Sequence, residues 1–200
     1  MDSLTSRYDK QVKAIVVFGD IRGFSVWEQS VTRPEIEFKP LMNCFDAMVD
    51  EFEAKTGYFT KNLGDGYMQI VELQADTHDC IPALRVLKET VKFATSVQTV
   101  IRKSPWPRPD GFRVRVSSGH VWKKQGNKTD YVGRHVNLAH KLLRVSPQTE
   151  FLAHQSFLEL MARRQTHEIG VKFSKLPPDR RIPDGVLKAD MNALWSFRKA

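Results

Sequence analysis

The apolar run VKAIVVF, residues 12–18, constrains the fold of this chain more than any other stretch. Its residues do not alternate between apolar and polar, as they would in a strand with one exposed face. A short apolar run of this kind is typical of a strand buried on both faces. The sequence therefore predicts a buried strand near the start of the fold, with Asp20 shortly after it.

Two amphipathic helices and a hairpin are predicted to follow this strand. After a loop at Gly19–Thr32, Pro34 fits the first turn of a helix that runs to about Lys55, because a residue there does not need its backbone N–H. Asp65 lies in a Gly-Asp-Gly turn, and glycine tolerates the positive φ of tight hairpin turns. The other expected elements are strands at 58–63 and 67–73, a helix at 80–102, a strand at 112–118 that continues into HVWKK, a turn at Gln125–Asn127 and a helix from 133 or 134 to about 145.

The order of these elements is β-α-β-β-α-β, which is that of a ferredoxin-like sheet with helices on one face. A smaller region follows, with a strand at 151–154, a helix at 155–164 and strands near 169–174 and 193–198. The sequence thus predicts an α+β fold: a single domain over residues 1–200 with a ferredoxin-like βαββαβ sheet and a small C-terminal α/β extension.

The composition is ordinary for a globular protein, with 41% apolar and 27% charged residues. The net charge of +8 suits either a small polyanion, such as a nucleoside triphosphate, or a solvated basic surface. No zinc-finger, RNA-recognition or helix-turn-helix pattern supports nucleic-acid binding. There is no run long enough to cross a bilayer and the start is polar, so we expect a cytoplasmic protein. Cys44 and Cys80 are expected to be reduced thiols.

Asp20 and Asp65 can each be interpreted as a structural turn residue or as a metal ligand. An aspartate after a strand is commonly a turn residue or a helix cap, and an Asp-Gly pair is commonly a hairpin turn. If the first strand pairs with the hairpin, however, the two carboxylates converge, and their repulsion favours a cation between them. With oxygen ligands and no His or Cys nearby, that cation would be Mg²⁺ or Mn²⁺.

A third polar segment, DYVGRHVNLAHKLL, covers residues 130–143. On the predicted helix, Asn137 and Lys141 are four residues apart and share a face. Asp130 lies just before this helix. Asparagine is a poor helix former in a helix interior, which favours a task for Asn137 over an ordinary surface position.

Together these segments resemble the catalytic domain of the class III nucleotide cyclases, the adenylate and guanylate cyclase superfamily. Residues 18–25 are similar to the family pattern Phe-x-Asp-Ile-x-Gly-Phe-Thr, and residues 61–68 to Lys-x-x-Gly-Asp-x-x-Met. Residues 130–142 are similar to Asp-x-x-Gly-x-x-Val-Asn-x-Ala-x-Arg-Leu at every marked position except one, and FRVRVSSGHV resembles an Arg-rich strand of the family. The resemblance covers about residues 12–145, with a weaker continuation to 198.

The resemblance implies a two-metal reaction. Asp20, Asp65 and the backbone carbonyl of Ile21 would hold two Mg²⁺ or Mn²⁺ ions in each active site. One ion would lower the pKa of the substrate's ribose 3′-hydroxyl, and the other would hold the triphosphate. The hydroxyl oxygen would then attack the α-phosphorus in line, and pyrophosphate would leave.

The resemblance also implies that Lys61 and Asp130 recognise the base. Lysine donates hydrogen bonds and aspartate accepts them, which argues against the family's guanine pattern. Adenine and cytosine each offer a ring acceptor and an amino donor in the same order, and uracil offers O4 and N3–H, so the pair does not by itself exclude a pyrimidine. Tyr58, together with Phe59 and Tyr131, would narrow the base pocket. The ordinary alternative for these three rings is packing against the sheet.

The remaining implied roles concern the ribose and the phosphates. Asn137 would orient the ribose, and Lys141 stands where the family has an arginine that contacts the α-phosphate. Lysine keeps the charge but lacks the planar guanidinium, so Arg144 or Arg134 is a candidate substitute. Lys188 is the nearest match to a phosphate-binding lysine in the family's last strand.

In the family, one subunit supplies the metal ligands and the other the base, ribose and transition-state residues, so the resemblance implies a homodimer with two sites. The expected function is a nucleotide cyclase with a slight preference for a pyrimidine substrate, UTP or CTP. It would act in bacterial anti-phage signalling, where a separate effector protein reads the product. The alternatives are an adenylate cyclase that makes cAMP, a catalytically silent nucleotide-binding homologue and a nucleic-acid-binding module.

Overall fold

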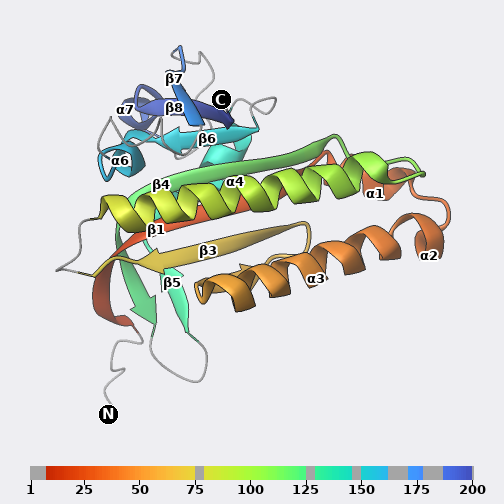
Figure 1. Cartoon of the computed structure of the whole chain (residues 1–200), viewed down its shortest axis with the longest axis horizontal. Helices are drawn as coiled ribbons and strands as arrows, with labels where there is room; N and C mark the ends of the chain where they lie inside the picture. Colours follow the sequence, from red (N-terminus) through yellow and green to blue (C-terminus); the bar gives the residue numbers. More distant parts are fainter. Residues whose placement is uncertain are drawn as a thin grey trace, which may run out of the picture.

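The computed structural model describes residues 8–74, 79–124, 129–145, 150–161, 171–177 and 187–199. Its centre is one mixed sheet with the strand order β2-β3-β1-β4-β6-β8-β7, and β5 pairs with β4 (Figure 1). Within these ranges, no helix combines the length and the apolar character that crossing a bilayer needs. The strands are β1 (Tyr8–Arg22), β2 (Phe59–Asn62), β3 (Gly66–Glu72), β4 (Gly111–Lys124), β5 (Asp130–Val132), β6 (Phe151–His154), β7 (Val171–Lys175) and β8 (Leu194–Lys199). The helices are α1 (Phe24–Ser30), α2 (Pro34–Glu37), α3 (Lys39–Thr56), α4 (Cys80–Lys103), α5 (Arg134–Lys141), the 3₁₀ turn η1 (Leu142–Arg144), α6 (Gln155–Leu158) and α7 (Lys188–Met191).

The first four strands form the expected ferredoxin-like unit. β1 pairs antiparallel with β3 on one side and with β4 on the other, and β2 pairs with β3. The resulting order is β2-β3-β1-β4. β1 is longer than the apolar run at 12–18, and the side chains of residues 14–17 within it have 0% exposure. The predicted α+β class and element order are confirmed.

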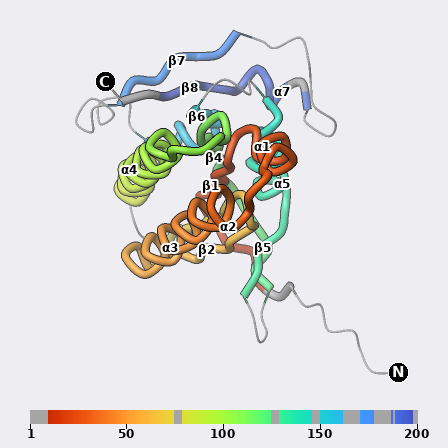
Figure 2. Tube along the Cα trace, turned by 90° about the vertical axis from the view of Figure 1, so that its right-hand side faces the viewer, coloured from red at the N-terminus to blue at the C-terminus, as the bar shows by residue number. Residues whose placement is uncertain are grey.

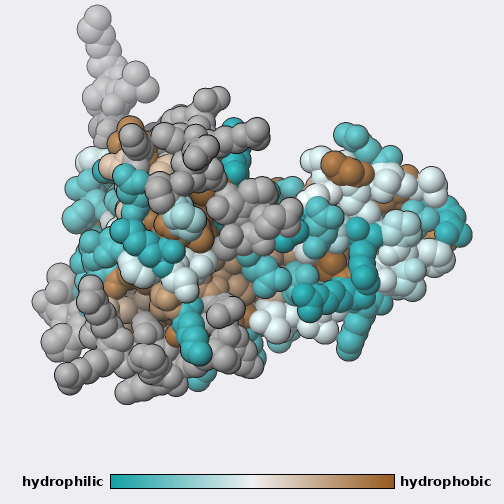
Figure 3. Space-filling view, turned by 90° about the horizontal axis from the view of Figure 1, so that it is seen from above, coloured by the Kyte–Doolittle hydropathy of each residue, from teal (hydrophilic) through white to brown (hydrophobic). Residues whose placement is uncertain are grey.

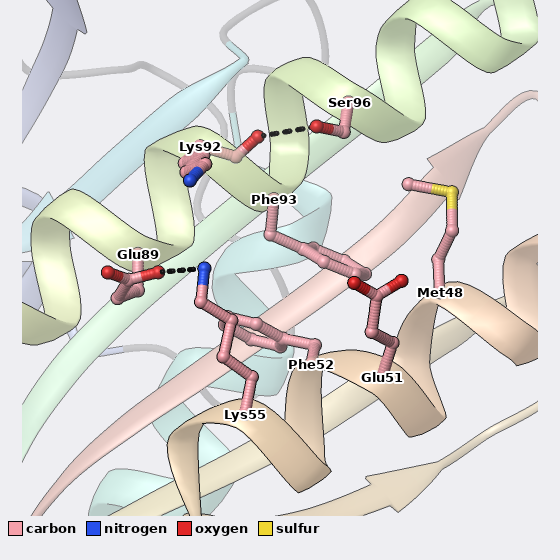
Figure 4. A pocket seen from close by; sticks show the side chains of 8 residues that line it. All are labelled: Met48, Glu51, Phe52, Lys55, Glu89, Lys92, Phe93 and Ser96. Carbon is pink, nitrogen blue, oxygen red and sulfur yellow. Dashed lines mark hydrogen bonds and ion pairs between the residues drawn. The ribbon is translucent and has the colours of Figure 1, made fainter.

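The two long helices α3 and α4 cover one face of the sheet (Figures 1 and 2). Ile15 and Val17 of β1 pack with these helices in the largest apolar cluster. Between the helices, the rings of Phe52 and Phe93 are stacked with 4.5 Å between centroids. A groove of about 140 Å³ lies beside these rings, and the Lys55–Glu89 ion pair, 3.4 Å long, joins the two helices there (Figure 4). None of the residues lining this groove is a predicted site residue.

Helix α5 covers the opposite face of the sheet (Figure 2). Val16 and Phe18 of β1 pack there with Val136 and Ala139 of α5. The expected placement of the helices of the βαββαβ unit on one face is confirmed for α3 and α4, and α5, which follows that unit in the chain, covers the other face. The physical reason is that β1 is apolar on both faces, so each face needs a cover.

The helical region before β2 differs from the sequence prediction in two ways. Helix α1 lies within the segment expected to be a loop, and its Trp27 is buried. The single helix expected at 34–55 is divided into α2 and α3 at Phe38. Pro40 explains this division, because proline cannot donate to the carbonyl four residues earlier and its ring crowds that position.

The C-terminal extension adds strands beside β4. β6 runs parallel to β4, and β8 and β7 follow in antiparallel pairing. Met191 of α7 packs in the same cluster as Leu138 of α5, so the extension contacts this helix as well as the sheet. The helix expected at 155–164 is shorter in the described residues: α6 ends at Leu158, and residues 159–161 form a turn and a bend. Residues 162–170 and the expected turn at 125–127 lie outside the described residues.

Exposed apolar side chains are scattered over the described surface. Figure 3 shows, on its right-hand side, a mainly hydrophilic face with apolar residues in separate small areas. The large apolar side chains that are exposed are Val26, Ile36, Leu63, Ile81, Trp122, Val132 and Leu187. They come from different elements, so polar groups are the better guide to a functional site.

Arg115 of β4 is a buried charge that connects β4 to the end of the α5–η1 segment. Its exposure is 0%, and its guanidinium donates to the backbone carbonyl oxygens of Leu142 (2.8 Å), Val114 (2.9 Å) and Val145 (3.2 Å). Burial lowers the pKa of Arg115 to about 9, so the group is still charged at pH 7. A single side chain thus donates to carbonyl groups of β4, of η1 and of the residue that follows η1.

Replacing Arg115 with methionine, which has a long side chain but no donors, tests this contribution. We expect the free energy of unfolding to fall by about 3 kcal/mol, because buried carbonyl groups lose their donors. Urea denaturation at pH 7 measures the change. Arg102→Met, at an arginine whose side chain is 67% exposed, is the matched control. Equal denaturation midpoints for Arg115→Met and the wild type would contradict the expectation.

Candidate active site

Asp20 and Asp65 meet where β1 ends beside the turn between β2 and β3. Asp20 lies opposite Gly66 in the strand register, and the N–H of Ile21 donates to the backbone oxygen of Asp65 over 2.8 Å. Burial raises the pKa of Asp20, and the negative charge of Asp65 adds to this increase. The two carboxylates therefore converge, as the pairing of the first strand with the hairpin predicted.

The glycines of the turn allow this close approach. Gly64 has a φ of 91°, in the left-handed region that favours glycine. A Cβ at Gly66 would collide with the carbonyl oxygen of Gly19. The Asn62 side chain accepts from the N–H of Gly64 over 2.8 Å and donates to Asp46 of α3 over 2.7 Å. The Gly-Asp-Gly sequence thus holds the turn close to the end of β1.

Arg113 belongs to this site and was missed by the sequence interpretation. It lies opposite Asp20 on β4, with its Nε and Nη2 atoms 2.7 and 2.5 Å from Asp20 Oδ2. Arg113 lowers the pKa of Asp20 against the effect of burial, and the net direction is still upward. The sequence shows that Arg113 and Arg115 alternate in FRVRV and so share a face of their strand. That this face bears Asp20 follows from the register of β1 with β4.

The donor set at this site fits a hard divalent cation. Asp20 and Asp65 lie beside each other and offer the oxygen ligands that such a cation prefers, while Arg113, already paired with Asp20, is a cation with which the ion would compete. Among the described residues, no group of three or more His, Cys, Asp or Glu side chains could hold a metal. Further ligands would therefore be backbone, water or substrate oxygens, and ligation by the Ile21 carbonyl stays a prediction.

Lys61 of β2 and Asp130 of β5 also meet, with 3.1 Å between Nζ and Oδ2. Phe59 packs on the cluster that contains Phe18, on the α5 face of the sheet. Side chains alternate along a strand, so Lys61 shares the face of Phe59, and Asp20 shares the face of Phe18. Both predicted groups of polar residues therefore lie on one face, with Lys61 and Asp130 supplied by the same protomer.

The three aromatic residues expected at the base pocket are placed differently. Tyr58 packs against the α3–α4 core, with the guanidinium of Arg85 5.8 Å from its ring centre, on the face opposite to Lys61, and its role in base recognition stays a prediction. Strand alternation explains this placement, since Tyr58 and Lys61 point to opposite faces. Phe59 and Tyr131 lie on the α5 face, 4.9 Å apart in an edge-to-face contact, where they pack in the core.

Helix α5 presents Asn137 and Lys141 as the sequence predicted. Val136 and Ala139 are buried against β1, whereas Asn137 is exposed and Lys141, one turn later, is half-buried. The two side chains lie on one side of the helix because they are four residues apart. Their roles toward a ribose and an α-phosphate stay predictions.

The basic residues proposed to substitute for the family arginine at Lys141 differ in their surroundings. Arg134 is paired with Asp190 at 2.8 Å, whereas Arg144 is exposed in η1, three residues after Lys141. Lys188 begins helix α7 and does not lie in the last strand, which starts at Leu194. The polar sequence KAD permits this helical turn before the strand, and the side chain of Lys188 lies outside the described part of the chain.

Comparison with solved structures identifies the architecture. The adenylyl cyclase CyaB from P. aeruginosa matches with a TM-score of 0.72 and 17% identity, over 96% of this chain and 96% of that one. The guanylyl cyclase Cya2 matches with a TM-score of 0.65 and 18% identity, over 95% and 93% of the two chains. The guanylate cyclase domain of RhGC from Catenaria anguillulae, in complex with GTP, gives 0.57 and 17%, over 94% and 96%.

No protein-family model and no curated protein matches the sequence. At identities this low, the structural likeness concerns the path of the chain. It extends over nearly the whole of this chain and of the three proteins compared, C-terminal extension included. The chain therefore has the α+β fold of class III nucleotide cyclase catalytic domains.

Proposed function

We propose that this protein is a nucleotide cyclase, which converts a nucleoside triphosphate to a 3′,5′-cyclic nucleotide and pyrophosphate. The observation that supports this most is the meeting of Asp20 and Asp65 on the same face as the Lys61–Asp130 pair, in a cyclase-like fold. Two carboxylates can bind the divalent cations that accompany a triphosphate, and a hydrogen-bond donor beside an acceptor can pair with the polar edge of a nucleobase.

Asp20, Asp65 and the carbonyl of Ile21 would hold two Mg²⁺ or Mn²⁺ ions. When bound, such ions supply Lewis acidity toward the ribose 3′-hydroxyl and neutralise the charge of the triphosphate. Arg113 balances the charge of Asp20 through their ion pair. Once separated from Asp20, its guanidinium offers a planar set of donors to phosphate oxygens.

Lys61 and Asp130 would read the base through one donor and one acceptor. Their contact brings these two groups side by side before any base arrives. Adenine and cytosine each offer a ring-nitrogen acceptor beside an exocyclic amino donor, whereas uracil and guanine each offer an exocyclic oxygen acceptor beside a ring N–H donor, so this pair would bear on the choice between CTP and UTP. We favour UTP or CTP, because the Phe59 and Tyr131 rings fill the space near this pair and Lys141 departs from the family arginine. ATP is the alternative substrate.

Asn137 and Lys141 would contact the ribose and the α-phosphate of a nucleotide held by the partner protomer. Asn137 is exposed, as a residue that acts across an interface has to be. Two copies related by a two-fold axis would then form two equivalent sites. The product would be read by a separate effector protein, in the manner of bacterial anti-phage signalling.

Incubation of the purified protein with ATP, GTP, CTP and UTP in turn, with Mn²⁺ or Mg²⁺, tests the reaction. We expect a cyclic pyrimidine nucleotide as the main product by mass spectrometry, and a rate at least about 100-fold lower for Asp65→Ala or with EDTA. Cyclic AMP as the main product would replace the pyrimidine proposal by the adenylate cyclase alternative. The absence of cyclic product from all four triphosphates would leave the catalytically silent homologue.

Co-expression of two inactive variants tests whether the sites are shared between protomers. Asp65→Ala and Asn137→Ala, given different tags and purified through both, would form a heterodimer with one intact site, so we expect about half of the wild-type activity. The pair Asp65→Ala with Asp20→Ala is the control, because both changes affect the same half of each site and no intact site can form. A mixed Asp65→Ala and Asn137→Ala dimer without activity would refute the shared site.

Thermal unfolding with increasing Mn²⁺, without nucleotide, tests the cation site directly. A ligand that binds the folded state raises the Tm, so Mn²⁺ should stabilise the wild type and have little effect on Asp65→Ala. Arg113→Met removes the cation that competes for Asp20, and we expect it to reach half of the stabilisation at about threefold less Mn²⁺ or lower. Arg102→Met should follow the wild type. A response of Asp65→Ala equal to that of the wild type would place Mn²⁺ elsewhere.

A further inference from the structure

The C-terminal extension contacts the start of helix α5 through a buried carboxylate. Asp190 of α7 is 5% exposed, and its Oδ1 atom lies 2.8 Å from Nη2 of Arg134, the first residue of α5. The arginine side chain itself is 63% exposed. Separating a buried carboxylate from its cationic partner strongly lowers the stability of the folded protein. This ion pair therefore restricts where the start of α5 can lie.

His154, at the end of β6, faces the same oxygen of Asp190, with 3.5 Å between Nε2 and Oδ1. Its Nδ1 accepts from the N–H of Ser156 over 3.2 Å, which places the proton of the neutral ring on Nε2, toward Asp190. Burial lowers the pKa of His154, against the opposing effect of Asp190, so the ring is mostly neutral at pH 7. Arg134 therefore supplies a full positive charge beside the carboxylate.

Ser117 of β4 also donates a hydrogen bond to the carbonyl oxygen of His135 in the first turn of α5 over 2.9 Å, and the packing contacts of the helix with the sheet and the extension are apolar. Val136 and Ala139 pack on the sheet, and Leu138 packs in the cluster that contains Met191 of the extension. Such contacts determine which side of the helix faces inward, but they are not directional and resist small shifts along the helix axis only weakly. An ion pair with a buried carboxylate does depend on direction and distance. Arg134 is also less than one turn away from Asn137.

We propose that Asp190 is a positioning residue for Asn137 and Lys141: by holding Arg134, it fixes α5 along its axis, and the C-terminal extension thereby controls the rate of turnover. The statement about turnover rests on the proposed cyclase function. The statement about the position of α5 rests on the contacts alone.

Steady-state kinetics of Asp190→Asn, Arg134→Gln and the double variant test the effect on turnover. We expect kcat to fall about 10- to 100-fold in each single variant, with KM for the metal–nucleotide changed less than about threefold, because a displaced transition-state contact lowers kcat rather than binding. The double variant should be no slower than the slower single variant, since both changes break one contact. Arg134→Lys should recover part of the rate. Asp79→Asn, at a carboxylate paired with Lys13 at 2.5 Å, is the control and should keep the wild-type rate.

Backbone amide hydrogen exchange tests the position of α5 without any activity. Amides of residues 134–141 should exchange about tenfold faster in Asp190→Asn and Arg134→Gln than in the wild type, while those of α4 keep their rates. Unchanged exchange in α5 overturns the inference, as does equal acceleration in α4, which would indicate general destabilisation. If Asp190→Asn does not fold, the Arg134 variants decide, because that side chain is largely exposed.

The two experiments separate the two proposals. A wild-type protein without cyclase activity would remove the proposed function, and the exchange comparison would still decide whether Asp190 holds α5. An active wild type with an unchanged kcat in the folded variants would overturn the control of turnover by the extension.

Discussion

The antiparallel pairing of β1 with β3 is the constraint on which the rest of the candidate site depends. It extends from Ala14 opposite Glu72 to Asp20 opposite Gly66 and continues into the hydrogen bond from Ile21 to Asp65. Because register is fixed by which face each apolar residue must occupy, a shift by one residue would turn Asp20 into the α3–α4 core. The register that buries the apolar side chains of β1 therefore also places Asp20 beside Asp65.

The two faces of the sheet have different tasks. The α3–α4 face is built from aromatic and aliphatic contacts such as the Phe52–Phe93 stack. The α5 face has a smaller apolar cluster and also bears the polar residues Asp20, Arg113 and Lys61. A fold of this kind can keep a stable layer on one side while the residues on the other side vary, which is consistent with adenylyl and guanylyl cyclases having similar architectures.

The sequence was sufficient for the element order, and it named residues that the structure brings together, Asp20 with Asp65 and Lys61 with Asp130, whose roles stay predictions. The apolar run at 12–18 and the Gly-Asp-Gly turn act through local rules, and local rules place β1, β2 and β3 correctly. The helix break at Phe38 follows from Pro40, so the sequence also contains the signal for it. The helical spacing of apolar residues on both sides of the break favoured a single helix instead. The face covered by α5 and the contact of Arg113 with Asp20 depend on pairing between strands far apart in sequence, which no local pattern contains.

Tyr58 shows how a correctly predicted element can still leave a candidate site residue on the opposite face of the sheet. The hairpin was predicted at the right place, but the side chain beside Lys61 in space is two residues away from it, at Phe59, because strands alternate. Lys188 is a similar case at the level of the element, since the strand matched by resemblance begins six residues later. Resemblance to a family indicates which residue types to expect at a site, whereas the three-dimensional structure determines which of those residues lie near one another.

The Lys61–Asp130 ion pair also bears on how a base would be selected. Its two side chains are 47% and 32% exposed, and ion pairs in such surroundings contribute about 0–1 kcal/mol. A base with a matching acceptor and donor therefore exchanges a weak contact for a similar one and gains little. A base with the reverse order leaves a carboxylate against an acceptor and an ammonium group against a donor. Selection at this position would then act by rejection, and it would separate adenine and cytosine, which share one order of groups, from guanine and uracil, which share the other.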